Sequence, residues 1–311
     1  MEDLALIIST TLMYSTPLIF AALGGVFSEN SGIVNLGIEG MMTIGAFAGA
    51  AAGYMLGNPW LAFIIGGLAG GLFALIHAIA TVSFNADHTI SGVAINLLAP
   101  GVALFASKIM FDGATMTPTI PMENKIPRPL NGVFESGSIL DTIFNAYATV
   151  FLAFALIAVV YYVLYKTKYG LRVRAVGEHP GAADTLGINV AKTRYSAVII
   201  SGILAGFGGA AMSLAVVSSF RPTLISGQGY IAIAAVIFGK WRPQWAMVAC
   251  LLFGFSTSLS VYFGNPELPF SINENLLSMI PYVVTLVVLV LFVKNSKSPA
   301  ALGNPYKKGE R

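Results

Sequence analysis

Long apolar runs are the feature of this sequence that most restricts its fold. A helix needs about 20 apolar residues to cross the roughly 30 Å hydrocarbon core of a bilayer. Nine segments approach that pattern, and the seventh is short and flanked by glycines, which predicts a broken helix. They lie near Leu4–Phe27, Leu36–Leu56, Trp60–Ser83, Thr89–Ser107, Ala146–Tyr165, Tyr195–Val217, Tyr230–Gly239, Gln244–Phe263 and Leu276–Val293. We therefore predict an all-α, polytopic transmembrane bundle of about nine spans, forming a single domain over residues 1–311.

Composition supports this prediction and excludes other classes of protein. Hydrophobic residues make up 56% of the chain and charged residues only 10%, whereas soluble domains carry about 25% charged residues. A water-soluble fold is excluded, and we expect a lipid bilayer, and no nucleic acid, around the chain. The single cysteine, Cys250, lies inside an apolar run, where we expect it to act as a small packing residue.

Glycines at helical spacing predict dense packing between helices. Gly66, Gly67, Gly70 and Gly71 form two overlapping steps of four residues, and Gly202 with Gly206 forms another. In lipid, where hydrophobicity gives helices no reason to associate, such small residues let two backbones approach closely.

The distribution of basic residues predicts the orientation, because positively charged loops stay in the cytoplasm. Thirteen of the 17 basic residues fall in the 166–194 loop, the 240–242 turn and the C-terminal tail. These segments are therefore expected inside the cell and the 111–145 loop outside. The resulting prediction is a multi-pass cell-membrane protein with its N-terminus outside and its C-terminus in the cytoplasm.

A first polar interruption of the apolar pattern runs from residue 28 to residue 40. It contains two glutamates and two asparagines with almost no room for a solvated loop. Unwound backbone at membrane depth is tolerated only inside protein or against a water-filled cavity, and ionisable groups there mark pathways. Asn35 and Glu39 are therefore predicted to line a substrate path. The alternative is an ordinary interfacial turn in which Glu29 faces water.

A second interruption, residues 226–232, follows the sixth apolar run and contains Gln228. Each break follows a long helix and precedes a short one rich in glycine and alanine, and the two preceding helices are predicted to run in opposite directions. This pattern is expected of an inverted repeat, in which broken helices from both halves meet around the substrate. With Asn96 from a third polar segment, the predicted path residues are Asn35, Glu39, Asn96 and Gln228.

Three other polar residues allow two interpretations. Asp87 and His88 are adjacent and could relay a proton, but Asp87 also suits the N-terminal cap of the following helix. His77 stands alone on an apolar face, which favours a core residue with its hydrogen bonds satisfied. The three histidines lack the spacing of metal ligands, so no metal site is predicted.

The loop 166–194 contains a sequence typical of a short exposed helix. Residues 178–187 read EHPGAADTLG, with Pro180 suited to the start and Gly187 to the end of the helix. Such a helix between two membrane spans could press into a groove on a cytoplasmic partner. The alternative is a solvated connector that its charges keep inside the cell.

Four blocks of the sequence together resemble a known family. Residues 29–42 (ENSGIVNLGIEGMM), 174–188, 227–239 (GQGYIAIAAVIFG) and 281–286 resemble, in that order, segments of permeases of nucleoside and simple-sugar ABC importers. That family also includes the ribose and branched-chain amino acid permeases. The resemblance implies a type II-like permease fold. It also assigns coupling to an ATPase to the residues Gly177, Glu178, His179, Pro180, Ala183, Asp184, Leu186 and Gly187.

The same resemblance implies the function and the partners. We expect a permease subunit that moves nucleosides into the cell by alternating access, with a homologous second permease and an extracellular substrate-binding lipoprotein. ATP and Mg²⁺ are expected on a separate ABC ATPase, with no cofactor in this chain, because the sequence lacks the glycine-rich phosphate-binding loop of ATPases. Alternatives are a ribose-like sugar permease, an ion-coupled secondary transporter using Glu39, Asp87 and His88, or a membrane enzyme. No catalytic constellation supports the last of these.

Overall fold

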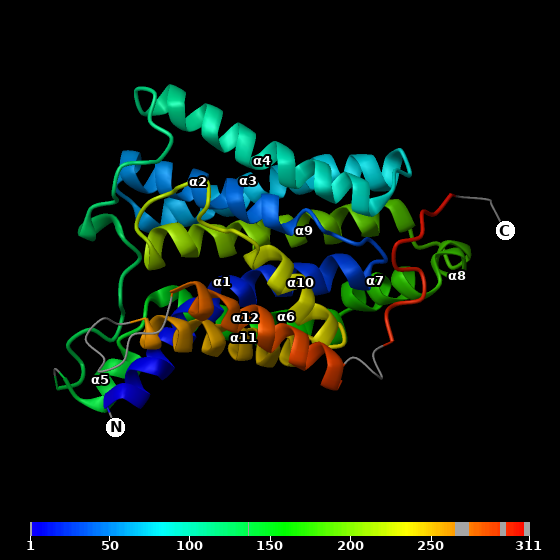
Figure 1. Cartoon of the computed structure of the whole chain (residues 1–311). Coiled ribbons are helices and arrows are strands. Elements are labelled where there is room, and N and C mark those ends of the chain that lie inside the picture. The colour runs from blue at the N-terminus through cyan, green and yellow to red at the C-terminus, as the bar shows by residue number, and fades with distance from the viewer. Residues whose placement is uncertain (1, 136, 265–273, 293–296, 308–311) are drawn as a thin grey trace.

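The described part of the chain is built from helices, and no β-strand occurs within it (Figure 1). The computed structural model describes residues 2–135, 137–264, 274–292 and 297–307. Its α-helices are α1 (Glu2–Asn30), α2 (Ile38–Leu56), α3 (Pro59–Ala78), α4 (His88–Met110), α5 (Ile139–Phe144), α6 (Ala148–Lys166), α7 (Lys168–Glu178), α8 (Pro180–Thr185), α9 (Val190–Ala211), α10 (Gln228–Phe238), α11 (Pro243–Phe263) and α12 (Glu274–Phe292). Short π-helical turns extend α3 (η1, Ile79–Ser83) and α9 (η3, Met212–Val216), and a 3₁₀ turn, η2, covers Met122–Asn124.

Helix α9 forms the centre of the bundle and packs against α1, α2 and α3. The predicted glycine stripes lie at these contacts. A Cβ atom added to Gly70 would lie 2.8 Å from the Cα atom of Gly206, and one added to Gly45 would lie 2.5 Å from the same atom. Backbones of α2, α3 and α9 therefore touch directly, which confirms the dense packing that the glycine spacing predicts.

Six of the described helical segments are long and apolar enough to cross a membrane. They are Asp3–Asn30, Pro59–Ser83, His88–Met110, Ala148–Lys166, Val190–Val216 and Pro243–Phe263. The predicted count of about nine spans is not confirmed. Helix α2 has sufficient length but contains Glu39 and many small residues, and α10 is only 11 residues long, as the prediction of a broken helix requires. Part of the ninth predicted span, near Val293, lies outside the described residues.

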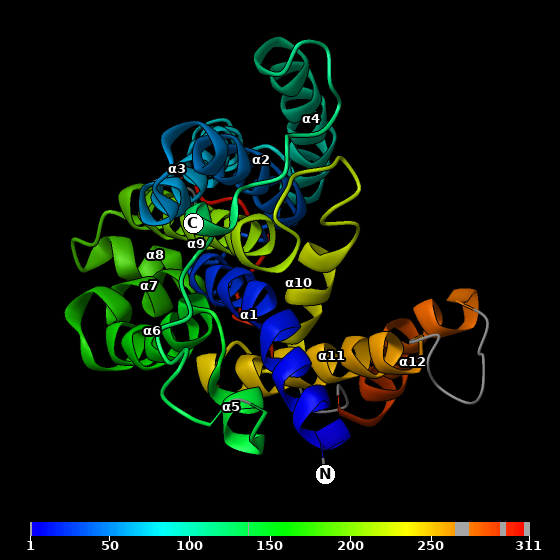
Figure 2. The same cartoon turned by 90° about the vertical axis from the view of Figure 1, so that its left-hand side faces the viewer.

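The bundle has two distinct ends, and α4 and α12 lie at its edges (Figure 1 and Figure 2). Helix α5 and the start of α1 lie at one end, and α7, α8 and residues 297–307 lie at the other (Figure 1). Helix α4 stands at the edge of the bundle, and α12 stands at the edge beyond α10 and α11 (Figure 2). Both edge helices expose large apolar side chains along their length, among them Leu97, Phe105, Leu286 and Val290. Apolar surface of this extent suits contact with lipid or with another membrane subunit.

Several polar residues outside the breaks have structural roles. Asp87 caps α4, because its Oδ1 accepts a hydrogen bond of 2.9 Å from the amide of Ile90. His77 is fully buried, with its ring nitrogens 2.8 Å from Ser91 Oγ and 3.1 Å from the carbonyl oxygen of Val34. Cys250 is buried as a packing residue. Within the described residues no group of three histidine, cysteine or acidic side chains could hold a metal ion.

Candidate functional site

The two predicted breaks meet at Glu39. Its carboxylate accepts a hydrogen bond of 2.6 Å from the amide of Gly227 through Oε1 and another of 2.6 Å from the amide of Gly229 through Oε2. Gly227 precedes α10 in a left-handed conformation and has no side chain to cap the helix. Glu39, from the first turn of α2, therefore satisfies the free amides at the start of α10 and compensates the positive end of its dipole.

The close approach of α2 and α10 requires glycine. A Cβ atom added to Gly229 would lie 2.5 Å from the Cα atom of Glu39, which no side chain could tolerate without separating the helices. The contact confirms that the two breaks meet, whereas the inverted repeat itself stays a prediction.

Asn96 connects three elements at the same junction. Its Oδ1 accepts a hydrogen bond of 2.8 Å from the amide of Gly40, and its Nδ2 donates to the carbonyl oxygen of Leu36 and to the hydroxyl of Tyr230, both at 2.8 Å. The side chain thus joins α4 to the first break and to α10. Because both of its N–H groups and its carbonyl are used, its orientation is fixed.

Gln228 lies in the first turn of α10, beside the Glu39 contacts. It is half-buried, and its side-chain amide forms no hydrogen bond with the described residues. Glu39, Asn96 and Gln228 therefore come together from three separate helices, as candidate path residues should. We call the group formed by Glu39, Asn96, Gln228 and Tyr230 the polar junction.

Asn35 does not belong to the polar junction. It is fully buried, and its Nδ2 donates a hydrogen bond of 2.9 Å to Ser201 Oγ on α9. Its role in substrate contact stays a prediction, because the described contacts tie it to helix packing. Tyr230 is the residue of the junction that the sequence analysis missed. Its position two residues after Gln228 was the available signal, but tyrosines are too common in this chain for position alone to select one.

Glu29 is buried and does not face water, so the alternative of an ordinary interfacial turn is wrong. Its carboxylate accepts a hydrogen bond from the indole nitrogen of Trp241, and the neighbouring Asn30 Nδ2 donates to the Trp241 carbonyl oxygen at 3.1 Å. The end of α1 is thereby attached to the turn that follows α10. Both ends of α10 are held by glutamates of the first break.

The predicted short helix is present as α8, with Pro180 at its first position and Gly187 beyond it at φ +80°. The residues that flank α8, Glu178, His179, Leu186 and Gly187, are exposed, whereas Pro180 and Asp184 within it are half-buried. Ala183 packs inward against Val176 and Val190. Helix α7, which precedes α8, was not predicted. The exposed surface that ends at Leu186 suits contact with another protein.

Gly177 belongs to the packing between α7 and the first break. A Cβ atom there would collide with the carbonyl group of Asn30. Of the predicted coupling residues, Gly177 and Ala183 are thus buried supports, and the others lie at or near the surface.

Residues 299–306 pack across α7 and the first break, and we call them the C-terminal strap. The amide of Ala301 donates to the Gly177 carbonyl oxygen at 2.8 Å, and the amide of Gly303 donates to the Gly32 carbonyl oxygen at 3.0 Å. Burial and a hydrogen bond to the negatively charged Asp184 raise the pKa of Tyr306. The sequence analysis treated this segment only as a basic tail.

Arg194 fixes the strap to the break from within the protein. It is only 2% exposed. Its Nε donates to the Ser31 carbonyl oxygen at 3.3 Å, and its Nη1 donates to the Asn304 carbonyl oxygen at 3.2 Å. The first break, α7 and the strap therefore form one connected unit.

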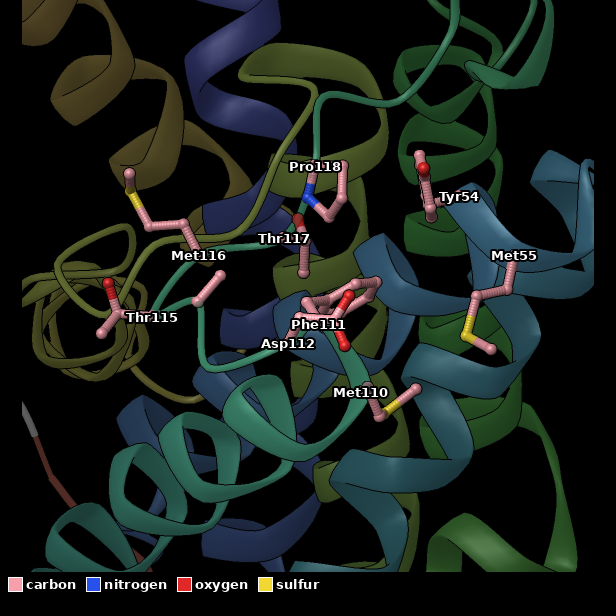
Figure 3. Close-up of a pocket in the computed structure, with 10 residues that line it drawn as sticks. Tyr54, Met55, Met110, Phe111, Asp112, Thr115, Met116, Thr117 and Pro118 are labelled. Carbon is pink, nitrogen blue, oxygen red and sulfur yellow. The ribbon is translucent and has the colours of Figure 1, made fainter.

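A groove of about 670 Å³ lies away from the polar junction, where α2 and α4 end (Figure 3). It is lined by Tyr54 and Met55 of α2, by Met110 of α4, and by residues 111–112 and 114–118 that follow α4. The lining is mainly apolar and open to the surface, and it contains no charged side chain other than Asp112. The groove does not contain any of the predicted path residues.

The profile of the family described as branched-chain amino acid transport system, permease component, matches residues 7–291. The chain belongs to this family. It is therefore a multi-pass membrane transport subunit and not an enzyme, and it requires an ABC ATPase and a substrate-binding partner.

Relatives match along the whole chain. The chain is 45% identical to the guanosine ABC transporter permease protein NupQ of Bacillus subtilis, over 100% of this chain and 99% of that protein. It is 42% identical to the nucleoside ABC transporter permease protein NupC of Lactococcus lactis, over 99% of each. A more distant relative is the guanosine ABC transporter permease protein NupP of Bacillus subtilis, 26% identical over 97% of this chain and 85% of that protein.

Proposed function

We propose that this chain is the permease subunit of an ATP-driven importer that brings nucleosides into the cell. The observation that carries the proposal is the similarity from end to end to relatives named for guanosine and nucleoside transport, at 45% and 42% identity. Family membership supplies the transport mechanism, and these relatives favour nucleosides over simple sugars or branched-chain amino acids. An ion-coupled carrier is not favoured by membership of an ABC permease family.

The proposed substrate path passes the polar junction. Glu39, Asn96 and Gln228 lie together where two broken helices meet, and polar groups inside a membrane bundle mark such pathways. Their hydrogen bonds join α2, α4 and α10 in addition to the close backbone contacts that these helices make at Gly40 and Gly229. Asn35 would line the path at a more deeply buried position, where it donates a hydrogen bond to Ser201.

The proposed coupling contact is the exposed surface of α8. Movement of a cytoplasmic ATPase against Glu178, His179 and Leu186 would be transmitted through the buried Gly177 and the C-terminal strap to the first break. The hydrogen bonds of Ala301 and Gly303 form that connection. Displacement of the break then alters the polar junction and gives alternating access.

The partners and orientation follow from the same assignment. The α8 end would face the cytoplasm, because the 166–194 loop, the 240–242 turn and the C-terminal tail carry most of the basic residues. The α5 end would face a substrate-binding lipoprotein outside. ATP and Mg²⁺ would bind only to the ATPase, with no cofactor in this chain. A homologous second permease would cover the exposed edge helices, as suggested by two guanosine permeases named from one organism.

Reconstitution of the complex tests this function. The chain would be co-expressed with its genomic neighbours, placed in liposomes with the binding protein, and assayed for uptake of nucleosides and sugars with and without ATP. We expect nucleoside uptake that requires ATP and stimulates its hydrolysis. Uptake that persists without ATP and collapses with the ion gradient would contradict the ABC importer, and uptake of sugars alone would contradict the nucleoside substrate.

A further inference from the structure

Two tyrosine rings are exposed beside the polar junction. Tyr230, in the first turn of α10, is 47% exposed, and Tyr282, on α12, is 58% exposed. A Cβ atom added to Gly227 would lie 4.0 Å from the Tyr282 hydroxyl oxygen, so both tyrosines flank the start of α10. Figure 2 shows α10 between α4 and α12.

The depth of this site argues against rings that simply face lipid. Helix α10 has 11 residues, and at 1.5 Å per residue its first turn lies about 16 Å from its other end. That distance is about half of the roughly 30 Å hydrocarbon core. Tyrosines that contact lipid concentrate at the membrane interfaces instead, where their hydroxyls reach water. With the far end of α10, beside the exposed Lys240 and Arg242, at the cytoplasmic surface as proposed above, the two tyrosines lie near mid-depth and indicate a polar path.

The hydrogen bonds leave the Tyr230 ring available to a ligand. Asn96 Nδ2 binds the Tyr230 hydroxyl at 2.8 Å and is itself fixed by Leu36 and Gly40. The ring is thereby held at its hydroxyl while the residue stays 47% exposed. A fixed aromatic face is the type of surface on which nucleobases stack, largely regardless of base identity.

The charges at the junction favour an uncharged ligand. Both carboxylate oxygens of Glu39 are used by the amides of Gly227 and Gly229, and the positive end of α10 offsets the charge. The free amide of Gln228 offers both a donor and an acceptor to a base or a ribose. Such a combination fits a neutral nucleoside better than a phosphorylated nucleotide.

We propose that Tyr230 and Tyr282 form the stacking surface for the base of the transported nucleoside, with Asn96 positioning Tyr230 and Gln228 contacting the polar edge of the substrate. The inference rests on the proposed function and adds the residues that touch the base. Neither tyrosine is among the path residues that the sequence analysis predicted.

The test measures the maximal rate of ATP-dependent guanosine uptake by the complete complex in liposomes, at saturating guanosine and binding protein. The variants are Tyr230→Phe, Tyr230→Leu, Tyr282→Phe and Tyr282→Leu. Tyr162→Leu is the matched control, because Tyr162 is also exposed, at 62%, but lies on α6. Thermal unfolding of each purified complex shows whether a variant is folded, and only folded variants are compared.

We expect the leucine variants to lower the maximal rate about tenfold, because loss of base stacking costs about that much. Tyr282→Phe should stay near the wild-type rate, and Tyr230→Phe, which keeps the ring but loses the bond to Asn96, should lose clearly less than Tyr230→Leu. Equal rates for Tyr230→Leu and Tyr162→Leu would overturn the inference. So would equal losses in Tyr230→Phe and Tyr230→Leu, which would assign the effect to the hydroxyl and its bond to Asn96.

The same experiment separates this inference from the proposed function. If the wild-type complex takes up neither guanosine nor any other nucleoside in an ATP-dependent way, both the proposed function and the stacking surface are overturned. A wild-type complex that takes up guanosine, together with tyrosine variants that do not differ from the control, would overturn only the stacking surface. If one leucine variant fails to fold, the other tyrosine and the two phenylalanine variants decide the outcome.

Discussion

The carboxylate of Glu39 lies 2.6 Å from the amide nitrogen of Gly229, although 190 residues separate them in the sequence. A side chain at the start of one helix thereby caps the start of another. The two helix starts that it joins belong to different breaks in the apolar pattern. This contact places the candidate substrate path at the junction of α2 and α10.

Replacing Glu39 by glutamine should weaken this junction. The amide keeps one acceptor oxygen but points N–H groups at a backbone amide, so one donor of α10 loses its partner. We expect a loss of about 1–3 kcal/mol in stability and slower substrate uptake. Thermal unfolding of the purified complex measures the first effect. Glu123→Gln, at an exposed position in η2, is the matched control, and equal unfolding temperatures for the two variants would contradict the prediction.

A methyl group on Gly206 should destabilise the centre of the bundle. The added Cβ atom would lie 3.0 Å from the Cα atom of Gly67 and would collide with the carbonyl oxygen of Gly66. We expect Gly206→Ala to cost about 1–3 kcal/mol, as overpacking of a dense core does. Gly101→Ala is the control, because a Cβ atom there meets nothing within 4 Å. Similar thermal stability of both variants in detergent would show that the helices can separate freely.

Replacing Arg194 by lysine should release the C-terminal strap. One ammonium group cannot reach both the Ser31 and the Asn304 carbonyl oxygens that the guanidinium contacts through separate nitrogens. We expect faster cleavage within residues 297–307 by a protease added to the purified protein. Arg172→Lys, at an exposed site on α7, should leave cleavage unchanged. Cleavage of the Arg194→Lys variant at the wild-type rate would argue that the backbone bonds of Ala301 and Gly303 suffice.

A charge on Leu186 should disturb coupling without unfolding the protein. The side chain is 82% exposed, so aspartate there removes no internal packing. Under the proposed function, Leu186→Asp lowers the uptake per ATP hydrolysed or the amount of ATPase that co-purifies. Val133→Asp, at an exposed position in the loop that lies toward the other end, serves as the control. If the ratio of uptake to ATP hydrolysis is unaltered, the proposed coupling contact at α8 is wrong.

Much of the fold could be predicted because apolar runs of membrane length leave a chain few choices. The helices around Leu4, Trp60 and Gln244 begin and end close to the predicted limits. The count of spans could not be fixed in this way, since α2 combines sufficient length with a glutamate and many small residues. Helix α7 was missed because its charged residues resemble those of a solvated loop.

Most residues of the candidate site could be predicted from the sequence, but the contacts between them could not. Polar residues inside apolar runs singled out Glu39, Asn96 and Gln228, which the structure brings together. The partner of Glu39 is a pair of backbone amides, and backbone amides leave no mark on a sequence. Asn35 was assigned to the same group, but the rotation of the chain at the first break turns it toward Ser201. The C-terminal strap has no periodic pattern that would reveal its docking.

The glycine contacts among α2, α3 and α9 also restrict how the protein can change shape. Where main chains touch through Gly45, Gly70 and Gly206, a small sliding motion would drive backbone atoms into each other, because no flexible side chain lies between them. These three helices therefore form one rigid unit. Helix α2 meets α4 and α10 through glycines as well, because Cβ atoms added to Gly40 and Gly229 would lie 2.7 Å from the Ile95 carbonyl oxygen and 2.5 Å from the Glu39 Cα atom. A transport cycle would then move these helices together as one rigid body, and the change of shape would fall on their contacts with other helices or with a second subunit.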